Sequence, residues 1–332
     1  MKRKSIINKL ELAYSPFTNY EFGIVNDYSI IEKAIEQASL YVIAQRPAMS
    51  FENIIPNQEE NILEFEIHQR NNPEILKCKF PYLQKVFEAT GKNDIGIVIN
   101  YHDKQETQDK ASSGNGHGIS FIGYENNKSR FLFCISPEKF LRNFWRDEIR
   151  CEIEGDIRTF LRYKVHYTGN TTEKSILKKL IGNSPLQEII SLDHPFTNND
   201  LPAHEIVILC FEFHDHFEIQ TFGDESIVDN MVDALTGKNS SGQKTIFFEA
   251  EKALIKAMQP GYNKEMFNNF PVSNVGLYDK NCAVVSYTFM DPITLYYENG
   301  QIEGGLTPNG GDVIIVMDNK SFKLDKAKSV RL

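Results

Sequence analysis

Hydrophobic residues recur with two different periods along the chain, which predicts both helices and strands. Apolar residues follow Ser29 at helical spacing as far as Val42, and a second helical pattern runs from Pro81 to Thr90. Shorter apolar runs predict strands at 95–101, 119–124 and 131–136. We therefore expect residues 1–150 to form a domain of mixed α and β structure.

The pattern changes after residue 150. A strand is predicted within 158–170, two short helices follow it, and residues 205–213 form the clearest pattern of a buried strand. The segment 247–258 has the spacing of a helix that ends before Pro260. Apolar runs separated by Asn-Gly pairs then predict β-hairpins in the C-terminal part.

The composition argues against several classes of protein. The 332 residues carry 36 Lys and Arg against 45 Asp and Glu, and this formal net charge of −9 argues against a cationic coat that binds nucleic acid non-specifically. The 23 Phe and 14 Tyr supply ample apolar area for a packed core. The length corresponds to about two domains.

Neither a membrane anchor nor a disulfide framework is expected. No run of about 18 apolar residues exists, and Asn8, Lys9 and Glu11 interrupt the segment that would otherwise imitate a signal peptide. The five cysteines are widely spaced and form no CxxC pair, which favours free thiols in a cytoplasmic protein. We therefore expect no membrane partner.

A local excess of cations interrupts the acidic composition. Between Ile157 and Gly182 the single acid is Glu173, against six cations: Arg158, Arg162, Lys164, Lys174, Lys178 and Lys179. Lys and Arg contact phosphates, and interleaved aromatic side chains can stack, so this segment is a candidate nucleic-acid interface. A solvated face, balanced by acids elsewhere in the fold, is the alternative.

A carboxylate lies within the predicted helix near residue 251. Glu251 shares a helical stripe with Leu254, Ile255 and Met258. A carboxylate that faces a core must be paired, hydrogen-bonded or bound to a metal, whereas one at the edge of the stripe needs no special role. Spacing alone does not distinguish Glu251 from its neighbour Glu249.

Two other patterns have ordinary structural explanations. His214 and His216 would project from one face of a strand, where they could share a metal, but an exposed strand end explains them as well. The glycine-rich segment 114–118 is similar to a phosphate-binding turn. Because a strand rather than a helix follows it, a hairpin loop is predicted there.

Four segments occur in an order that resembles the GIY-YIG nuclease domain, over about residues 150–271. They are Tyr-Thr-Gly-Asn-Thr at 167–171, Lys178-Lys179-Leu180, Ser-Pro-Leu-Gln at 184–187, and the helix with Glu251 followed by Pro260, Tyr262 and Asn263. The chain departs from the family's first motif, because Ile157 stands where that motif has a tyrosine. Lys179 stands where the family has an arginine.

The resemblance implies a fold and a division of the chain. It implies an α+β fold, with a small mixed or antiparallel sheet flanked by helices at 151–275. An N-terminal α/β domain at 1–150 would precede it and a β-hairpin extension at 276–332 would follow. The N-terminal domain would recognise the target, or contact a protein partner or a second copy of the chain.

The resemblance also implies a chemistry, namely a metal-dependent endonuclease that hydrolyses DNA phosphodiester bonds in a restriction, defence or mobile-element context. Glu251 would hold Mg²⁺ or Mn²⁺, and Tyr167 would orient or deprotonate the attacking water. Lys179 would stabilise charge in the transition state, and Asn263 would position one of these groups. Contacts with DNA would come from Arg158, Arg162, Lys164, His166 and Lys178.

Two alternatives to an active nuclease stay open at this point. A catalytically degenerate protein of the same fold would bind nucleic acid or protein without cleaving it. Alternatively, the resemblance is accidental and residues 150–271 form an unrelated α+β domain.

Overall fold

The computed structural model of the chain describes residues 4–18, 33–36, 38–57, 59–81, 94–101, 116–125, 128–171, 176, 197–198, 201–202, 204–223, 228–238, 240–271, 277, 282–317 and 320–328. The chain divides into two compact units. Unit 1 comprises residues 1–46, 162–194 and 206–332, and unit 2 comprises 47–161 and 195–205. Each unit contains its own β-sheet.

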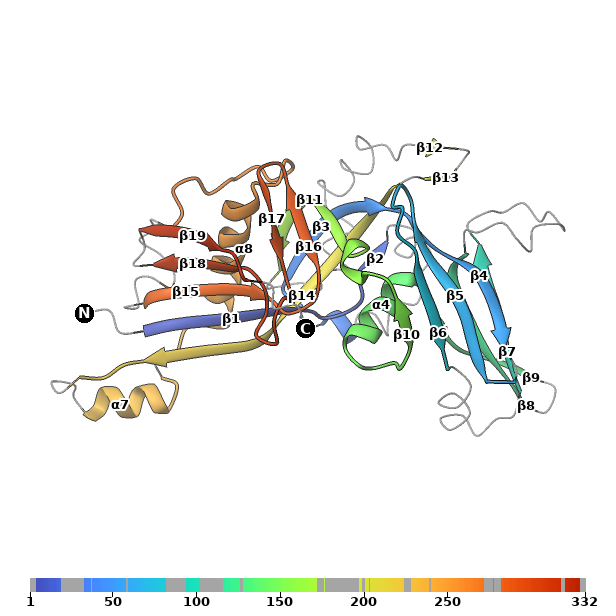
Figure 1. The fold of residues 1–332 in the computed structure, drawn as a ribbon. Coiled ribbons are helices and arrows are strands. Elements are labelled where there is room, and N and C mark those ends of the chain that lie inside the picture. The colour runs from blue at the N-terminus through green and yellow to red at the C-terminus, as the bar shows by residue number, and fades with distance from the viewer. Residues whose placement is uncertain are drawn as a thin grey trace. The chain divides into compact units, whose positions relative to one another are not determined.

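Unit 1 is built on a 10-stranded sheet (Figure 1). Its strands follow the spatial order β17 (Gly300–Glu303), β16 (Thr294–Tyr297), β11 (Arg162–Asn170), β3 (Leu40–Pro47), β14 (His204–Gln220), β1 (Lys4–Leu12), β15 (Cys282–Phe289), β18 (Val313–Met317) and β19 (Ser321–Asp325). The short strand β2 (Phe17–Thr18) also pairs with β14. The centre of this sheet joins strands that are far apart in the sequence: β1 lies between β15, to which it is parallel, and β14, to which it is antiparallel.

The burial pattern explains why these segments form strands. Side chains of β1 alternate between buried and partly exposed along its whole length, as expected for a strand with one face on a core. The central strands β3 and β14 instead contain continuous apolar runs, and residues 40–44 and 207–211 are almost completely buried. The helix α8 (Gln243–Met258) packs against β11, and α7 (Val228–Leu235) follows β14 along the chain.

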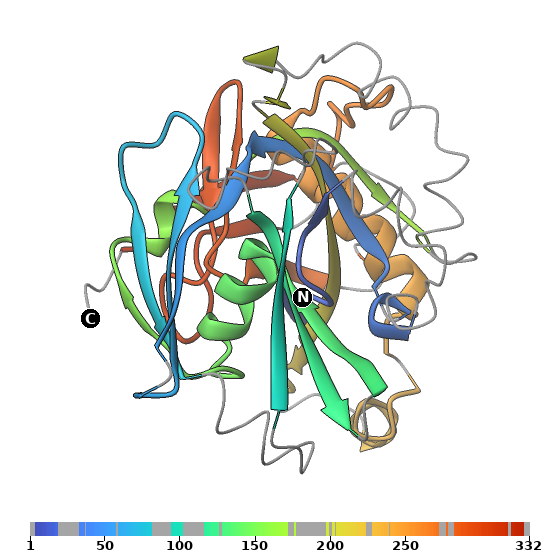
Figure 2. The same ribbon diagram turned by 90° about the vertical axis from the view of Figure 1, so that its right-hand side faces the viewer.

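Unit 2 contains a 7-stranded sheet. Its strands follow the order β10 (Glu152–Glu154), β6 (Leu76–Phe80), β5 (Ile62–Gln69), β4 (Met49–Asn57), β8 (Gly116–Glu125) and β7 (Asp94–Tyr101), and β9 (Lys128–Ile135) also pairs with β8. The helix α4 (Pro137–Trp145) lies against this sheet (Figure 2). It packs there through Phe140, whose ring contacts Phe51, Phe65 and Phe80. The remaining elements are a 3₁₀ turn at Ile157–Thr159 and the two-residue strands β12 (Thr197–Asn198) and β13 (Leu201–Pro202).

The expected fold class is wrong. The described residues are mostly β, with one large curled sheet and a second sheet, rather than a small α+β sheet flanked by helices. Local patterns missed β1 because its pairing partners, β14 and β15, lie far away in the sequence. The consecutive strands β4, β5 and β6 were missed because they are short polar-apolar alternations that become strands only when they pair with one another. The helix predicted as far as Val42 is also wrong at its end, since Tyr41 and Val42 belong to β3.

The units also group the chain differently from the expected boundaries near 150 and 275. The strands β1, β2 and β3 share a sheet with β11, β14 and the C-terminal strands, because β1 and β3 flank β14. Several local expectations are confirmed: β7, β8 and β9 overlap the strands predicted in the first half, and α8 ends before Pro260. The Asn299-Gly300 pair joins β16 and β17 in a hairpin, as predicted. The helices predicted at 81–90 and between 171 and 191 fall almost wholly outside the described residues.

None of the helices in the described part of the chain combines the length and the hydropathy that are needed to cross a bilayer.

Candidate functional site

Two of the four segments that suggested a site from the sequence, 167–171 and 251–263, meet at one edge of β11, and the other two lie outside the described residues. This strand pairs with β3 along residues 164–170, whereas its pairing with β16 stops at Lys164. The backbone groups that point away from β3 beyond Lys164 therefore need other partners. Residues after α8 and on α8 supply them.

Asn263 takes the place of a neighbouring strand at Thr168. Its side-chain oxygen accepts a hydrogen bond from the N–H of Thr168 at 2.9 Å, and its side-chain nitrogen donates to the carbonyl of Thr168 at 2.7 Å. The N–H of Tyr262 donates to the carbonyl of His166 at 3.2 Å. A carboxamide has one donor and one acceptor in the arrangement of a peptide group, so Asn263 satisfies both backbone groups of a buried residue.

Glu251 covers the next position of the same edge. The N–H of Asn170 donates to its Oε1 at 3.1 Å, and the side-chain amide of Asn170 donates to its Oε2. Asn170 is buried and Glu251 is partly buried. Hydrogen bonds to an ionised carboxylate are stronger than those between neutral groups, so Glu251 fastens α8 to the end of β11.

Tyr167 is a protonated phenol whose pKa responds to the charge of this carboxylate. Burial raises the pKa of Tyr167, a hydrogen bond with Tyr41 acts in the opposite direction, and the charge of Glu251 raises the pKa further. The ring packs near Tyr41, with the centroids 5.9 Å apart. Both rings lie so close to Gly169 that a Cβ there would approach them within 2.8 Å. Tyr167 is therefore placed to hydrogen-bond rather than to act as a base.

We call Glu251 and Asn263, which together hydrogen-bond to the free edge of β11, the edge cover. The sequence predicted that Tyr167, Lys179 and Glu251 converge. Of these, Lys179 lies outside the described residues, and the charge of Glu251 acts on Tyr167. Asn170 was not predicted as the partner of Glu251, although it lies within the 167–171 motif. Lys178 also lies outside the described residues.

The donor set of this cluster fits a hydrogen-bonded brace better than a site for Mg²⁺ or Mn²⁺. Mg²⁺ is usually held by one or two carboxylates and retained waters. Both oxygens of Glu251 already accept hydrogen bonds from Asn170, and the amide of Asn263 is engaged with the backbone. Across the described ranges, no group of three or more His, Cys, Asp or Glu side chains is placed to hold a metal ion.

The cations of the predicted interface divide between the two units. Arg158 belongs to unit 2, where its guanidinium lies 5.6 Å from the ring centre of Trp145. Arg162 and Lys164 are exposed on β11 in unit 1, and no described acid lies within ion-pair distance of either. His166 is buried, within 3.3 Å of the side-chain oxygen of Gln45.

An aromatic side chain that the sequence did not single out accompanies the two exposed cations. Tyr296 on β16 is paired with Lys164 in register, and the guanidinium of Arg162 lies 5.8 Å from its ring centre. Residues at alternate positions of a strand share a face, so Arg162 and Lys164 project in the same direction. We call Arg162, Lys164 and Tyr296 the cation–aromatic strip.

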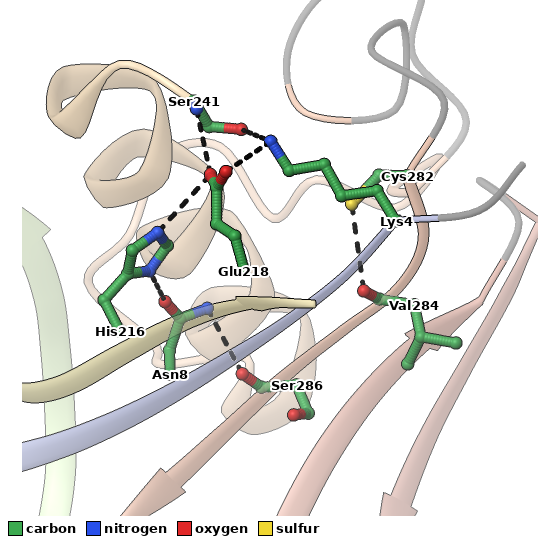
Figure 3. Close-up of polar contacts among 8 residues, drawn as sticks. All are labelled: Lys4, Asn8, His216, Glu218, Ser241, Cys282, Val284 and Ser286. Carbon is green, nitrogen blue, oxygen red and sulfur yellow. Dashed lines mark hydrogen bonds and ion pairs between the residues drawn. The ribbon is translucent and has the colours of Figure 1, made fainter. Parts of the chain in front are cut away.

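The two histidines near the end of β14 do not converge on a common point. His214 occupies the extra position of a β-bulge, and its Nδ1 lies 3.1 Å from Glu11. His216 instead approaches Asn8 at 2.8 Å and Glu218 at 3.5 Å (Figure 3). The bulge and these separate partners explain the pair as structural, so the expected alternative of an exposed strand end describes it better than a shared metal.

Figure 3 shows the network of polar contacts to which His216 belongs. The side-chain nitrogen of Asn8 donates to the carbonyl of Ser286 at 3.2 Å, so its oxygen faces His216 and accepts from Nδ1. Glu218 pairs with Lys4 at 2.5 Å and accepts from the N–H of Ser241 at 2.9 Å. Burial acts to raise the pKa of Glu218, but these contacts outweigh it and the pKa is lowered. This network links β1, β14 and β15 to the start of α8.

Comparisons of this chain with protein-family models, with curated proteins and with solved structures found no match.

Proposed function

We propose that the protein binds DNA through the cation–aromatic strip and does not cleave it at the edge cover. The observation that carries the proposal is the pair of exposed cations on β11, one of them over the ring of Tyr296, in a chain of net charge −9. Cations without acidic partners are free to neutralise phosphates, while the acidic remainder disfavours binding elsewhere.

The contacts of the edge cover support the second half of the proposal. To cleave DNA, this cluster would need a tyrosine that activates water and a carboxylate that holds a metal. Tyr167 has a raised pKa, and Glu251 and Asn263 are engaged with β11. Their spacing in the sequence is therefore explained by the need to cover a strand edge.

Charge reversal tests the binding. The double variant R162E/K164E should bind a fluorescently labelled DNA oligonucleotide at least about tenfold more weakly than the wild type. The slope of log K against the logarithm of the salt concentration should become less steep by about 2, because two phosphate contacts are lost. K320E/K328E is the matched control, since Lys320 and Lys328 are exposed residues of the same unit and the change in charge is identical. If both double variants weakened DNA binding equally, the cation–aromatic strip would not be the DNA-binding site.

Hydrolysis is tested with the same protein. We expect supercoiled plasmid incubated with Mg²⁺ or Mn²⁺ to stay intact at the level of a buffer control. E251Q is the appropriate variant for comparison, because its amide oxygen can still accept from Asn170 while the charge is lost. Cleavage that disappears both with EDTA and in E251Q would replace the proposal with a metal-dependent endonuclease.

A further inference from the structure

Two cysteines far apart in the sequence are neighbours in unit 2. Cys78 lies on β6, and Cys151 immediately precedes β10. The two strands are antiparallel, with Ile153 opposite Cys78, so Cys151 lies diagonally across from Cys78 on the same face of the sheet. Both side chains therefore project from adjacent strands on one face of the sheet.

The two thiols differ in exposure. Cys78 is buried, with 2 % of its surface exposed, and the neighbouring Cys151 together with burial raises its pKa. Cys151 is partly exposed, and its Sγ donates to the carbonyl of Glu152 at 3.3 Å. An oxidant dissolved in water therefore reaches Cys151 first.

The strand β10, which begins directly after Cys151, is short. β10 has three residues, forms the edge of its sheet and pairs with β6 alone. Its exposed Glu152 and Glu154 lie opposite Lys79 and Lys77, which favours the pairing. A three-residue edge is among the first parts of a sheet to open, so Cys151 can shift relative to Cys78.

We propose that Cys78 and Cys151 are a thiol pair that hydrogen peroxide converts into an intramolecular disulfide. The thiolate of Cys151 attacks one peroxide oxygen, forming a sulfenic acid and releasing hydroxide. The sulfur of Cys78 then attacks the sulfur of Cys151, and the sulfenic hydroxyl leaves as water with the Cys78 proton. Two thiols are oxidised, one peroxide is reduced, and two waters form in total.

The geometry also makes the bond reversible. Diagonal cross-strand positions are about 7–8 Å apart at Cα, slightly more than a relaxed disulfide spans. Cys151 lies outside the hydrogen-bonded part of β10 and can be drawn toward Cys78, at the cost of some strain. Strained disulfides are the ones that small thiols reduce readily. The expected product therefore forms with peroxide and is removed by dithiothreitol.

The experiment is a thiol count and a peptide map of the full-length folded protein after peroxide treatment. Two of the five free thiols should be lost, a Cys78–Cys151 cross-link should appear in the unreduced digest, and dithiothreitol should restore all five. C134S is the matched control, because Cys134 is a partly buried cysteine of the same unit and the cross-link should form in that variant as in the wild type. C78S and C151S should each abolish the cross-link.

A second measurement separates this inference from a general sensitivity to oxidation. Hydrogen exchange at residues 152–154 should slow after peroxide in the wild type, because the new bond holds β10 on β6, and should not slow in C151S. Thermal melting under reducing conditions checks that C151S is folded. Oxidation of Cys151 to the sulfinic acid without a cross-link, or a cross-link that joins Cys134 instead, would overturn the proposal.

Discussion

Two carboxylates of α8 lie two residues apart and have opposite environments. Glu251 faces β11, is partly exposed, and has both oxygens hydrogen-bonded to Asn170. Glu249 is on the other side of the helix, since each residue turns about 100° around the axis. It is 1 % exposed, with Oε1 paired to Lys252 at 2.9 Å and Oε2 lacking any partner among the described residues.

The difference shows that position along a helix does not reveal what a carboxylate does. Burial raises the pKa of Glu249, and the pairing with Lys252 only partly opposes this effect. Its charge is therefore held at a cost to stability, whereas Glu251 supplies acceptors that a strand edge would otherwise lack. Helical spacing alone did not distinguish the two carboxylates, and the structure shows that Glu249 is the buried one.

Removing the acceptor at residue 251 should have the largest effect. We expect E251A to lower the free energy of unfolding by about 3 kcal/mol, because it removes the acceptor of two hydrogen bonds that buried Asn170 donates. E251Q should lose about 1 kcal/mol, since an amide oxygen remains. Urea denaturation measures both. Equal losses in the two variants would show that the charge, rather than the acceptor, matters.

Truncating the other half of the edge cover should have the next largest effect. N263A should lower the free energy of unfolding by about 2 kcal/mol, because two backbone groups of buried Thr168 lose their partners. N263D should be less stable still, since its carboxylate cannot donate to the carbonyl of Thr168 and faces it with a charge. A stable N263D, measured in the same denaturation experiment, would contradict the proposed role.

Neutralising the buried carboxylate should have a smaller effect of opposite sign. We expect E249Q to raise the free energy of unfolding at pH 7 by about 1 kcal/mol, because a neutral amide is less costly to bury than a charge. E265Q, at an exposed glutamate of the same unit, is the control and should change nothing.

The pH dependence of this effect has a definite sign. The folded pKa of Glu249 is raised, so the wild type loses stability as the pH rises from the unfolded value near 4.5 through the folded value. The advantage of E249Q should therefore be present at pH 7 and should vanish near pH 4, where Glu249 is neutral. A constant difference between pH 4 and pH 7 in thermal melting would contradict this account.

The smallest expected effect concerns Tyr167. Because the charge of Glu251 contributes to the raised pKa of Tyr167, E251Q should lower that pKa slightly toward the ordinary value. Spectrophotometric titration of the phenols measures the change, and subtracting the curve of Y167F assigns it to this residue. An unchanged titration would place Glu251 too far from Tyr167 to affect its charge.

Parts of the fold and the site could be read from local patterns, and others could not. The strand β14 and the helix α8 each correspond to an uninterrupted hydrophobic pattern with a single period, and both were predicted from the sequence. The segments β4 and β5 were not predicted as strands, because a short alternation becomes a strand only when partners exist on either side. The first residues of β3 also fit the helical spacing that begins at Ser29, so a helix was predicted there. The approach of Glu251 to Tyr167 was expected from a resemblance, but the partners of Glu251 and Asn263 on β11 were not.

The sequence by itself determined the apolar runs that become β14 and α8, the local excess of cations near β11, and the absence of closely spaced cysteines. These are properties of neighbouring residues, and local propensity and charge are sufficient to state them. Only the tertiary structure decided that Glu251 and Asn263 cover a strand edge, that Tyr296 lies beside Arg162, and that Cys78 is a neighbour of Cys151. Each of these contacts depends on strand register across dozens of residues or more, and register is set by the packing of the whole sheet.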